Sequence, residues 1–212
     1  MFSVYTYYDL IGSRSYHDDQ LEMIEHWSLS WAKQGWNPVV LGRIHAEAHP
    51  MFSRYEARVR QLPTVNSTEY EAACYLRWLA VAQQGGGVMS DYDVVNYGFN
   101  PCPPQSELVV MDCRDGDVCP SVVAGTAAGF MSACLSFACT EADSVDTSHS
   151  GSPHTSDMIL LQRDYREGRV LASPLVRQYG DHGWDTAPLV HYSHEATGHT
   201  NRIPCMKTAR EI

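Results

Sequence analysis

The sequence is poor in positive charge. Lys and Arg total 15 against 25 Asp and Glu, which gives a formal net charge of −10. Nucleic acids and anionic membranes are bound through clustered Lys and Arg, so we expect no nucleic-acid partner. An anionic small substrate would instead need a metal ion or a few well-placed arginines.

Long apolar runs are also absent. No stretch approaches the roughly 20 apolar residues that span a bilayer, and the first residues lack the basic and apolar regions of a signal peptide. The seven cysteines contain no C-x-x-C pair, and their odd number leaves at least one unpaired. We therefore predict reduced thiols in a cytoplasmic protein without a transmembrane segment in this chain. A local bridge between Cys113 and Cys119 is the alternative.

What is present is a globular composition, with 44% hydrophobic residues, five Trp and twelve Tyr. A chain of 212 residues fits one α/β domain, so we predict a single domain over residues 1–212.

The first 42 residues predict a βαβ unit. Residues 2–8 are rich in β-formers, residues 18–34 carry apolar side chains at helical spacing, and residues 38–42 form a second apolar strand. A strand, a helix and a strand in this order indicate a parallel sheet. The predicted fold class is α/β with a mostly parallel central sheet.

The strongest predicted helix covers residues 68–84, where Thr68 and Glu71 have the spacing of a capping box. A triple glycine at 85–87 ends it, and a strand follows that stops at Asp91. Open α/β sheets bind ligands at the carboxyl ends of their strands. Further on, the sequence predicts strands at 108–111 and 188–192 and a helix at 155–163.

Asp91 and Asp93 stand one residue apart at that strand end. On an extended strand, residues i and i+2 share a face, so both carboxylates would point the same way and bind Mg²⁺ or Mn²⁺. The alternative is a surface turn decorated with aspartates.

Two further residues complete the predicted site. Arg77, in the middle of the helix, can bind a phosphate through two parallel hydrogen bonds; a structural, ion-paired arginine is the alternative. His191, at the end of a short strand, is the candidate third metal ligand. His194 is its rival, and either histidine can equally be structural.

Residues 77–80 (RWLA), 85–87 (GGG) and 90–93 (SDYD) together resemble the central signature of DxD-containing glycosyltransferases of the GT-A fold. The resemblance is to the family that holds the initiating mannosyltransferases of yeast and the clostridial toxin glucosyltransferases. It covers residues 70–97 and extends to residues 4–9.

This resemblance implies a GT-A, Rossmann-like domain that binds a nucleoside diphosphate sugar with Mn²⁺ or Mg²⁺ and transfers the sugar, as a hexosyltransferase. Residues 1–100 would bind the donor, and residues 105–212 would bind the acceptor and supply the last metal ligand. The implied metal ligands are Asp91, Asp93 and His191. The implied donor contacts are Thr6, Tyr8, Arg77, Asp91 and Tyr92.

The chain departs from the family pattern at three positions. Cys74 stands where many members have an acidic residue, one helical turn before the arginine, and Ser90 stands where Leu or Phe is common. The glycine and lysine that commonly follow the metal-binding histidine are not in register after His191. The first departure bears on the contact to the donor sugar.

An inverting transfer needs a base near the acceptor hydroxyl, and Asp157 at a predicted helix N-terminus is the sequence candidate. An ordinary early-turn acid is the alternative, and a retaining enzyme needs no such base. The acceptor can be a carbohydrate, lipid or protein. The competing functions are a metal-dependent phosphohydrolase or nucleotidyl transferase, and a non-catalytic nucleotide-sugar binding module.

Overall fold

The computed structural model describes residues 2–11, 14–102, 107–141, 153–198 and 202–208. Its strands are β1 (Ser3–Tyr7), β2 (Asn37–Leu41), β3 (Gly86–Ser90), β4 (Val94–Asn96), β5 (Leu108–Arg114), β6 (Asp117–Thr126), β7 (Leu171–Ala172), β8 (Val176–Gln178) and β9 (Leu189–His191). Its helices are α1 (Arg14–Lys33), α2 (Arg43–Glu47), α3 (Phe52–Val59), α4 (Thr68–Gln83), α5 (Ala127–Ala138), α6 (Asp157–Arg166) and α7 (Arg202–Thr208).

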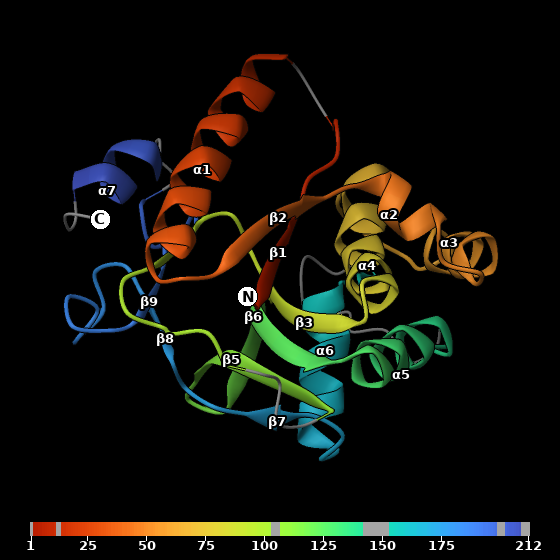
Figure 1. The fold of residues 1–212 in the computed structure, drawn as a ribbon. Helices are drawn as coiled ribbons and strands as arrows, with labels where there is room; N and C mark the ends of the chain where they lie inside the picture. Colours follow the sequence, from red (N-terminus) through yellow and green to blue (C-terminus); the bar gives the residue numbers. More distant parts are fainter. Residues whose placement is uncertain (1, 12–13, 103–106, 142–152, 199–201, 209–212) are drawn as a thin grey trace.

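Six strands form the central sheet in the order β2-β1-β3-β6-β5-β7. β1 is parallel to β2 and β3, and β5 is parallel to β7, whereas β6 is antiparallel to both of its neighbours. Five of these strands therefore run in one direction. The predicted α/β class with a mostly parallel sheet is confirmed, as is the βαβ unit made by β1, α1 and β2 (Figure 1).

Side chains that alternate along the central strands pack on opposite faces of the sheet. On one face, Val4, Val88 and Val122 join a buried cluster with the α1 tryptophans Trp27 and Trp31. On the other face, a second cluster combines side chains of β1, β3 and β6 with the buried sides of α4 and α5. Figure 1 accordingly shows α1 and α7 on one side of the sheet and α4 and α5 on the other.

A second sheet, in the order β4-β9-β8, places the C-terminal part of the chain beside the two aspartates. β4 pairs with β9 so that Val94 lies opposite His191. The amide of Tyr192 donates to the carbonyl of Asp93 at 2.9 Å. The backbone therefore fixes His191 next to Asp93, although the two residues are distant in sequence.

Local details differ from the sequence expectation at the two ends of α4. The helix is capped by Ser67, whose hydroxyl accepts from the amide of Tyr70, and not by Thr68. Gly86 has φ +85°, and a Cβ there would lie 2.6 Å from backbone atoms of Gly125 and Ala127. Gly86 therefore permits β3 to pack against the β6–α5 junction, which explains the glycine without a ligand.

The cysteines are reduced. All seven are free thiols, so the alternative of a bridge between Cys113 and Cys119 is wrong. None of the described helices combines the length and the apolar character that crossing a lipid bilayer requires.

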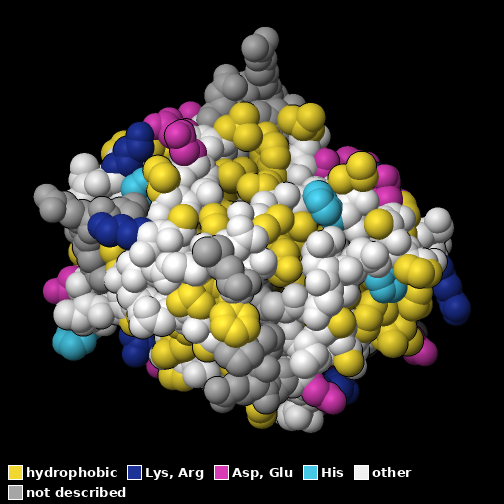
Figure 2. All heavy atoms as spheres, viewed as in Figure 1, with side chains coloured by type: hydrophobic (Ala, Val, Ile, Leu, Met, Phe, Trp, Pro, Cys, Tyr) yellow, Lys and Arg dark blue, Asp and Glu magenta, His cyan; other side chains and the backbone are white. Residues whose placement is uncertain are grey.

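Figure 2 shows one face of the molecule, on which hydrophobic side chains gather across the middle and charged side chains lie mainly at the edge. Lys and Arg are dispersed among the described residues on this face. That distribution agrees with the low content of basic residues in the sequence.

Candidate functional site

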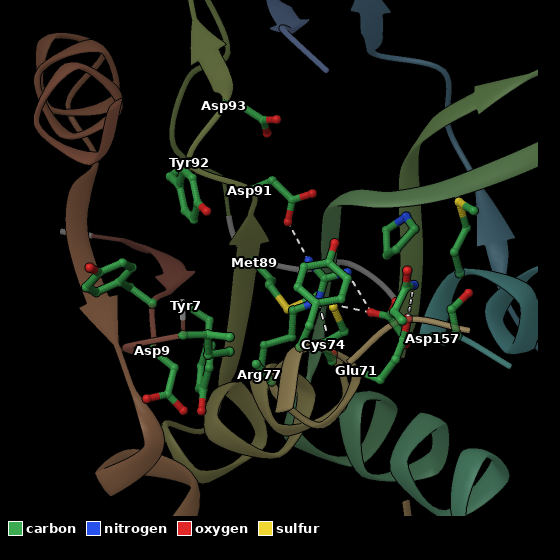
Figure 3. Close-up of a pocket in the computed structure, with 18 of the residues that line it drawn as sticks. Tyr7, Asp9, Glu71, Cys74, Arg77, Met89, Asp91, Tyr92, Asp93 and Asp157 are labelled. Atoms are coloured by element: carbon green, nitrogen blue, oxygen red, sulfur yellow. Dashed lines mark hydrogen bonds and ion pairs between the residues drawn. The ribbon is translucent and has the colours of Figure 1, made fainter. Parts of the chain in front are cut away.

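A cavity of about 400 Å³ opens where the carboxyl ends of β1 and β3 meet α4 and the start of α6. Its wall includes Arg77 from α4, Asp91 and Asp93 from the β3–β4 turn, Asp157 from α6 and Arg202 from α7. Figure 3 shows Arg77, Asp91 and Asp157 turned toward one another in this cavity. Charged groups from four separate segments thus converge at the predicted edge of the sheet.

The two aspartates lie in a turn and not on an extended strand. The amide of Val94 donates to the carbonyl of Asp91 at 3.1 Å, which closes the turn between β3 and β4. The expectation that strand geometry aligns Asp91 and Asp93 is therefore wrong. Their carboxylate oxygens nevertheless lie, with a ring nitrogen of His191, within 4.8 Å of one another.

This donor set fits a divalent cation. Asp93 is buried, and its Oδ1 has no hydrogen-bond partner, although it lies 3.5 Å from His191 Nε2. Two carboxylates with one imidazole suit Mn²⁺ or Mg²⁺. His194, the alternative ligand, is exposed and lines the cavity, but it belongs to no such cluster among the described residues.

Cations of the protein itself balance Asp93. Arg202 Nη1 lies 2.6 Å from Asp93 Oδ2. Burial acts to raise the pKa of Asp93, but His191 and Arg202 lower it below its usual value. Burial acts to lower the pKa of His191, but Asp93 and Asp112 raise it to about 10. His191 is therefore protonated at neutral pH, and a metal ion would displace its Nε2 proton.

Asp112 on β5 contacts the ring nitrogen of His191 that does not face Asp93. Its Oδ2 lies 3.1 Å from His191 Nδ1 and accepts from the hydroxyl of Ser121 at 2.7 Å. Gln178 Nε2 also lies 2.7 Å from His191 Nδ1. A carboxylate on Nδ1 turns Nε2 toward Asp93, the arrangement in which a second carboxylate orients a metal-binding histidine. Asp112, Cys119 and His191 form a second, overlapping group of ligand atoms within 4.8 Å.

Arg77 links the cluster of Asp91, Asp93 and His191 to α6. Its Nε and Nη2 lie 3.0 and 2.6 Å from Asp157 Oδ2, and its Nη1 donates to Asp91 Oδ1. The indole of Trp78 donates to the same oxygen of Asp157 at 2.9 Å. Burial acts to lower the pKa of Arg77, but Asp157 and Asp91 raise it well above its usual value, so the guanidinium stays charged. Burial also raises the pKa of Asp91, an effect that Arg77 opposes.

Of the other residues predicted to contact the donor, some line the cavity and one does not. Tyr8 and Tyr92 line the cavity, whereas Thr6 is buried and is not part of its wall. Asp157, the sequence candidate for a base, is buried and has one oxygen engaged by Arg77 and Trp78. The structure thus brings Arg77, Asp91, Asp93, Asp157 and His191 together.

The sequence patterns did not predict three residues that lie near the site. Asp112 lies in an apolar strand, and an acidic residue in such a run indicates a buried carboxylate with a specific partner. Glu71, assigned to a helix cap, instead lines the cavity. Arg202 is 109 residues away from its partner Asp93, and no local pattern pointed to it.

Comparisons with known proteins agree with this fold. A family model described as "Domain of unknown function (DUF8765)" matches residues 2–107, half of the chain. A similar solved structure is the "crystal structure of a glycosyltransferase involved in the glycosylation of the major capsid of PBCV-1". It shares 11% identity with a TM-score of 0.55, over 98% of this chain and 99% of that chain. No curated protein matches the sequence significantly. The fold is therefore that of a GT-A-like glycosyltransferase.

Proposed function

We propose that this chain, which belongs to the DUF8765 family, is a glycosyltransferase. In a metal-dependent reaction, it would transfer a hexose from a nucleoside diphosphate sugar to an acceptor hydroxyl. One observation carries the proposal. Asp91 and Asp93, which form a cluster with His191, line a cavity together with Arg77, in a chain with a glycosyltransferase-like fold. The acceptor would be a hydroxyl of a carbohydrate, lipid or protein.

In this proposal, Asp93 and His191 would hold Mn²⁺ or Mg²⁺ directly, and Asp91 would contact both the ion and the donor. The bound ion supplies Lewis-acid stabilisation of the negative charge on the diphosphate leaving group, a contribution of several kcal/mol in metal enzymes. The burial of Asp93 and the 3.5 Å distance from its Oδ1 to His191 Nε2 support this assignment, because a metal ion would take the place of the imidazole proton between these two atoms.

Arg77 would contact the diphosphate in the same step. Its guanidinium is already fixed by Asp157 on one side and Asp91 on the other, so little side-chain entropy is lost on binding. A preorganised cation beside the developing charge stabilises the transition state more than the ground state. The contacts of Asp157 favour a role in positioning Arg77 over the sequence candidate role of a base. Tyr8 and Tyr92, on the cavity wall, are proposed donor contacts.

A thermal-shift screen of nucleoside diphosphate sugars with and without Mn²⁺ tests the proposal, because a ligand that binds only the folded state raises its melting temperature. We expect one donor class to raise the melting temperature only with Mn²⁺. The double variant Asp91→Asn, Asp93→Asn should lose this shift.

The chain offers a matched control in a second D-x-D, Asp115 and Asp117, which is exposed between the end of β5 and the first residue of β6. The variant Asp115→Asn, Asp117→Asn should keep the shift. An equal shift in both double variants would contradict the proposed site. Donor binding without any turnover would identify a binding module, and release of inorganic phosphate a phosphohydrolase.

A further inference from the structure

Glu71 lies in the cavity wall with an oxygen that has no partner. The residue is 4% exposed, and Oε1 accepts from Asn66 Nδ2 at 2.6 Å, whereas Oε2 has no hydrogen-bond partner. A buried carboxyl oxygen without a partner costs free energy, so its presence at a cavity wall points to a ligand.

The position of Glu71 on α4 relates it to the metal cluster. Glu71, Cys74 and Arg77 follow at steps of three residues and all line the cavity, so they share one face of the helix. Six residues of helix separate Glu71 from Arg77, which is about 9 Å along the axis. Figure 3 shows Arg77 on the side of Asp91, and Glu71 beside Asp157. One cavity thus joins the proposed diphosphate site to Glu71.

This separation suits an in-line displacement. With the diphosphate held by Arg77 and by an ion bound at Asp91 and Asp93, the anomeric carbon and the attacking oxygen would come next, with reacting atoms about 3 Å apart. A base must then lie within hydrogen-bond reach of that oxygen, about 2.6–3.2 Å. Glu71 is the described carboxyl group on the cavity wall that is both buried and has an oxygen without a partner, apart from Asp93 in the metal cluster.

We propose that Glu71 is the catalytic base of an inverting transfer, and this proposal rests on the proposed function. Glu71 Oε2 takes the proton from the acceptor hydroxyl as the acceptor oxygen bonds to the anomeric carbon. The bond from that carbon to the diphosphate oxygen breaks, and its electron pair leaves with the diphosphate. Attack from the side opposite the leaving group inverts the anomeric configuration.

The electrostatic surroundings of Glu71 support this role. Burial raises its pKa to about 7, against the lowering effect of the Asn66 hydrogen bond. The groups around it are Cys74, Tyr75 and Arg77 on α4, Asp157 on α6, and Thr64 and His154 from the adjoining segments. A base with a pKa near the working pH is the most effective in proton transfer.

The test compares the wild type, Glu71→Gln and Glu69→Gln, a control on the same helix whose carboxylate is exposed and pairs with Arg60. The measurement is release of nucleoside diphosphate from a panel of UDP- and GDP-hexoses with Mn²⁺, with water as acceptor, between pH 5 and 9. We expect the wild-type rate to rise through about pH 7 to a plateau. In Glu71→Gln, the rate of nucleoside diphosphate release should fall about 100-fold or more and should no longer depend on pH. In Glu69→Gln, the rate and its pH dependence should match the wild type.

Two measurements separate this inference from its premise. Calorimetric binding of UDP or GDP with Mn²⁺ should agree between Glu71→Gln and wild type within about twofold, and NMR of the hexose released by the wild type should show inversion. Unchanged turnover in Glu71→Gln, a flat wild-type pH profile, or a retained anomer would overturn the role of Glu71 alone. No turnover of any donor by the wild type would overturn the proposed function and this inference together.

Discussion

Asp112 is the residue that ties the proposed metal site of Asp91, Asp93 and His191 to the central sheet. It is 1% exposed and lies 3.1 Å from His191 Nδ1. Because a second carboxylate fixes the orientation of a metal-binding histidine, we expect Asp112→Asn to weaken Mn²⁺ binding about 10- to 100-fold. Calorimetric titration with Mn²⁺ measures this effect.

The matched control is Asp164→Asn. Asp164 is also buried, but it pairs with Arg163 and Arg169 on and after α6. The Asp164→Asn variant should leave Mn²⁺ affinity unchanged even if it lowers the free energy of unfolding. Equal losses in the two variants would show that a general change in the fold, and not the orientation of His191, controls binding.

Glu71 makes the stability of the protein depend on pH. Its pKa of about 7 in the folded state lies above the ordinary value of 4.5, so between these values the folded state binds more protons than the unfolded state. The stabilisation is therefore complete below about pH 4.5 and is lost as pH rises through 7. Glu71→Gln removes this dependence and should be more stable than wild type by roughly 1–3 kcal/mol at pH 8.5.

Urea unfolding of wild type and Glu71→Gln from pH 4.5 to 8.5 measures the difference. Taking the difference between the two proteins cancels the titration of the other acids. A difference in unfolding free energy that stays constant with pH would mean that the pKa of Glu71 is not raised.

Among the secondary-structure elements, the junction of α4 and β3 depends on glycine at two adjacent positions. Gly85 and Gly86 both have positive φ, +92° and +85°, but a Cβ at position 85 would meet no atom within 4 Å, whereas one at position 86 would meet backbone atoms at 2.6 Å. Gly85→Ala should cost about 1–2 kcal/mol for the left-handed backbone. Gly86→Ala should cost about 1–3 kcal/mol more, because overpacking adds to that strain.

Chemical denaturation of the two glycine variants measures this contrast. If both alanine variants lose the same unfolding free energy, the close packing of β3 against the β6–α5 junction is not what requires glycine at position 86.

The elements differ in how far the sequence predicted them. β1, α1, β2, α4 and β3 follow from local periodicity, caps and glycine, and they position Arg77 and the two aspartates. α2 and α3 were not predicted. The turn at residues 91–93 was mistaken for strand, because alternation in a short segment does not distinguish the two.

The rest of the site depends on long-range pairing. The pairing of β4 with β9 brings His191 to Asp93, and α7 brings Arg202. The sequence offered His191 as a candidate but gave no register for β9, and it gave no local pattern for Arg202. The role of Glu71 was hidden because its spacing from Thr68 matched a cap that Ser67 provides instead.

In the whole molecule, the site should be stable without a metal ion. Arg202 and the protonated His191 balance Asp93, and Arg77 lies between Asp91 and Asp157. EDTA should therefore change the melting temperature by less than about 2 °C, unlike a structural metal site whose loss unfolds the domain. Scanning calorimetry with and without EDTA tests this, and a fall of about 10 °C or more would indicate a structural ion.

The central claim is that one divalent ion and the donor diphosphate share the site at Asp91, Asp93 and His191. The most direct measurement is an anomalous difference map from crystals grown with Mn²⁺ and a nucleoside diphosphate. We predict a single strong peak between the side chains of Asp93 and His191, next to the diphosphate and within reach of Arg77. No peak there, or a peak confined to Asp112 and Cys119, would contradict the account.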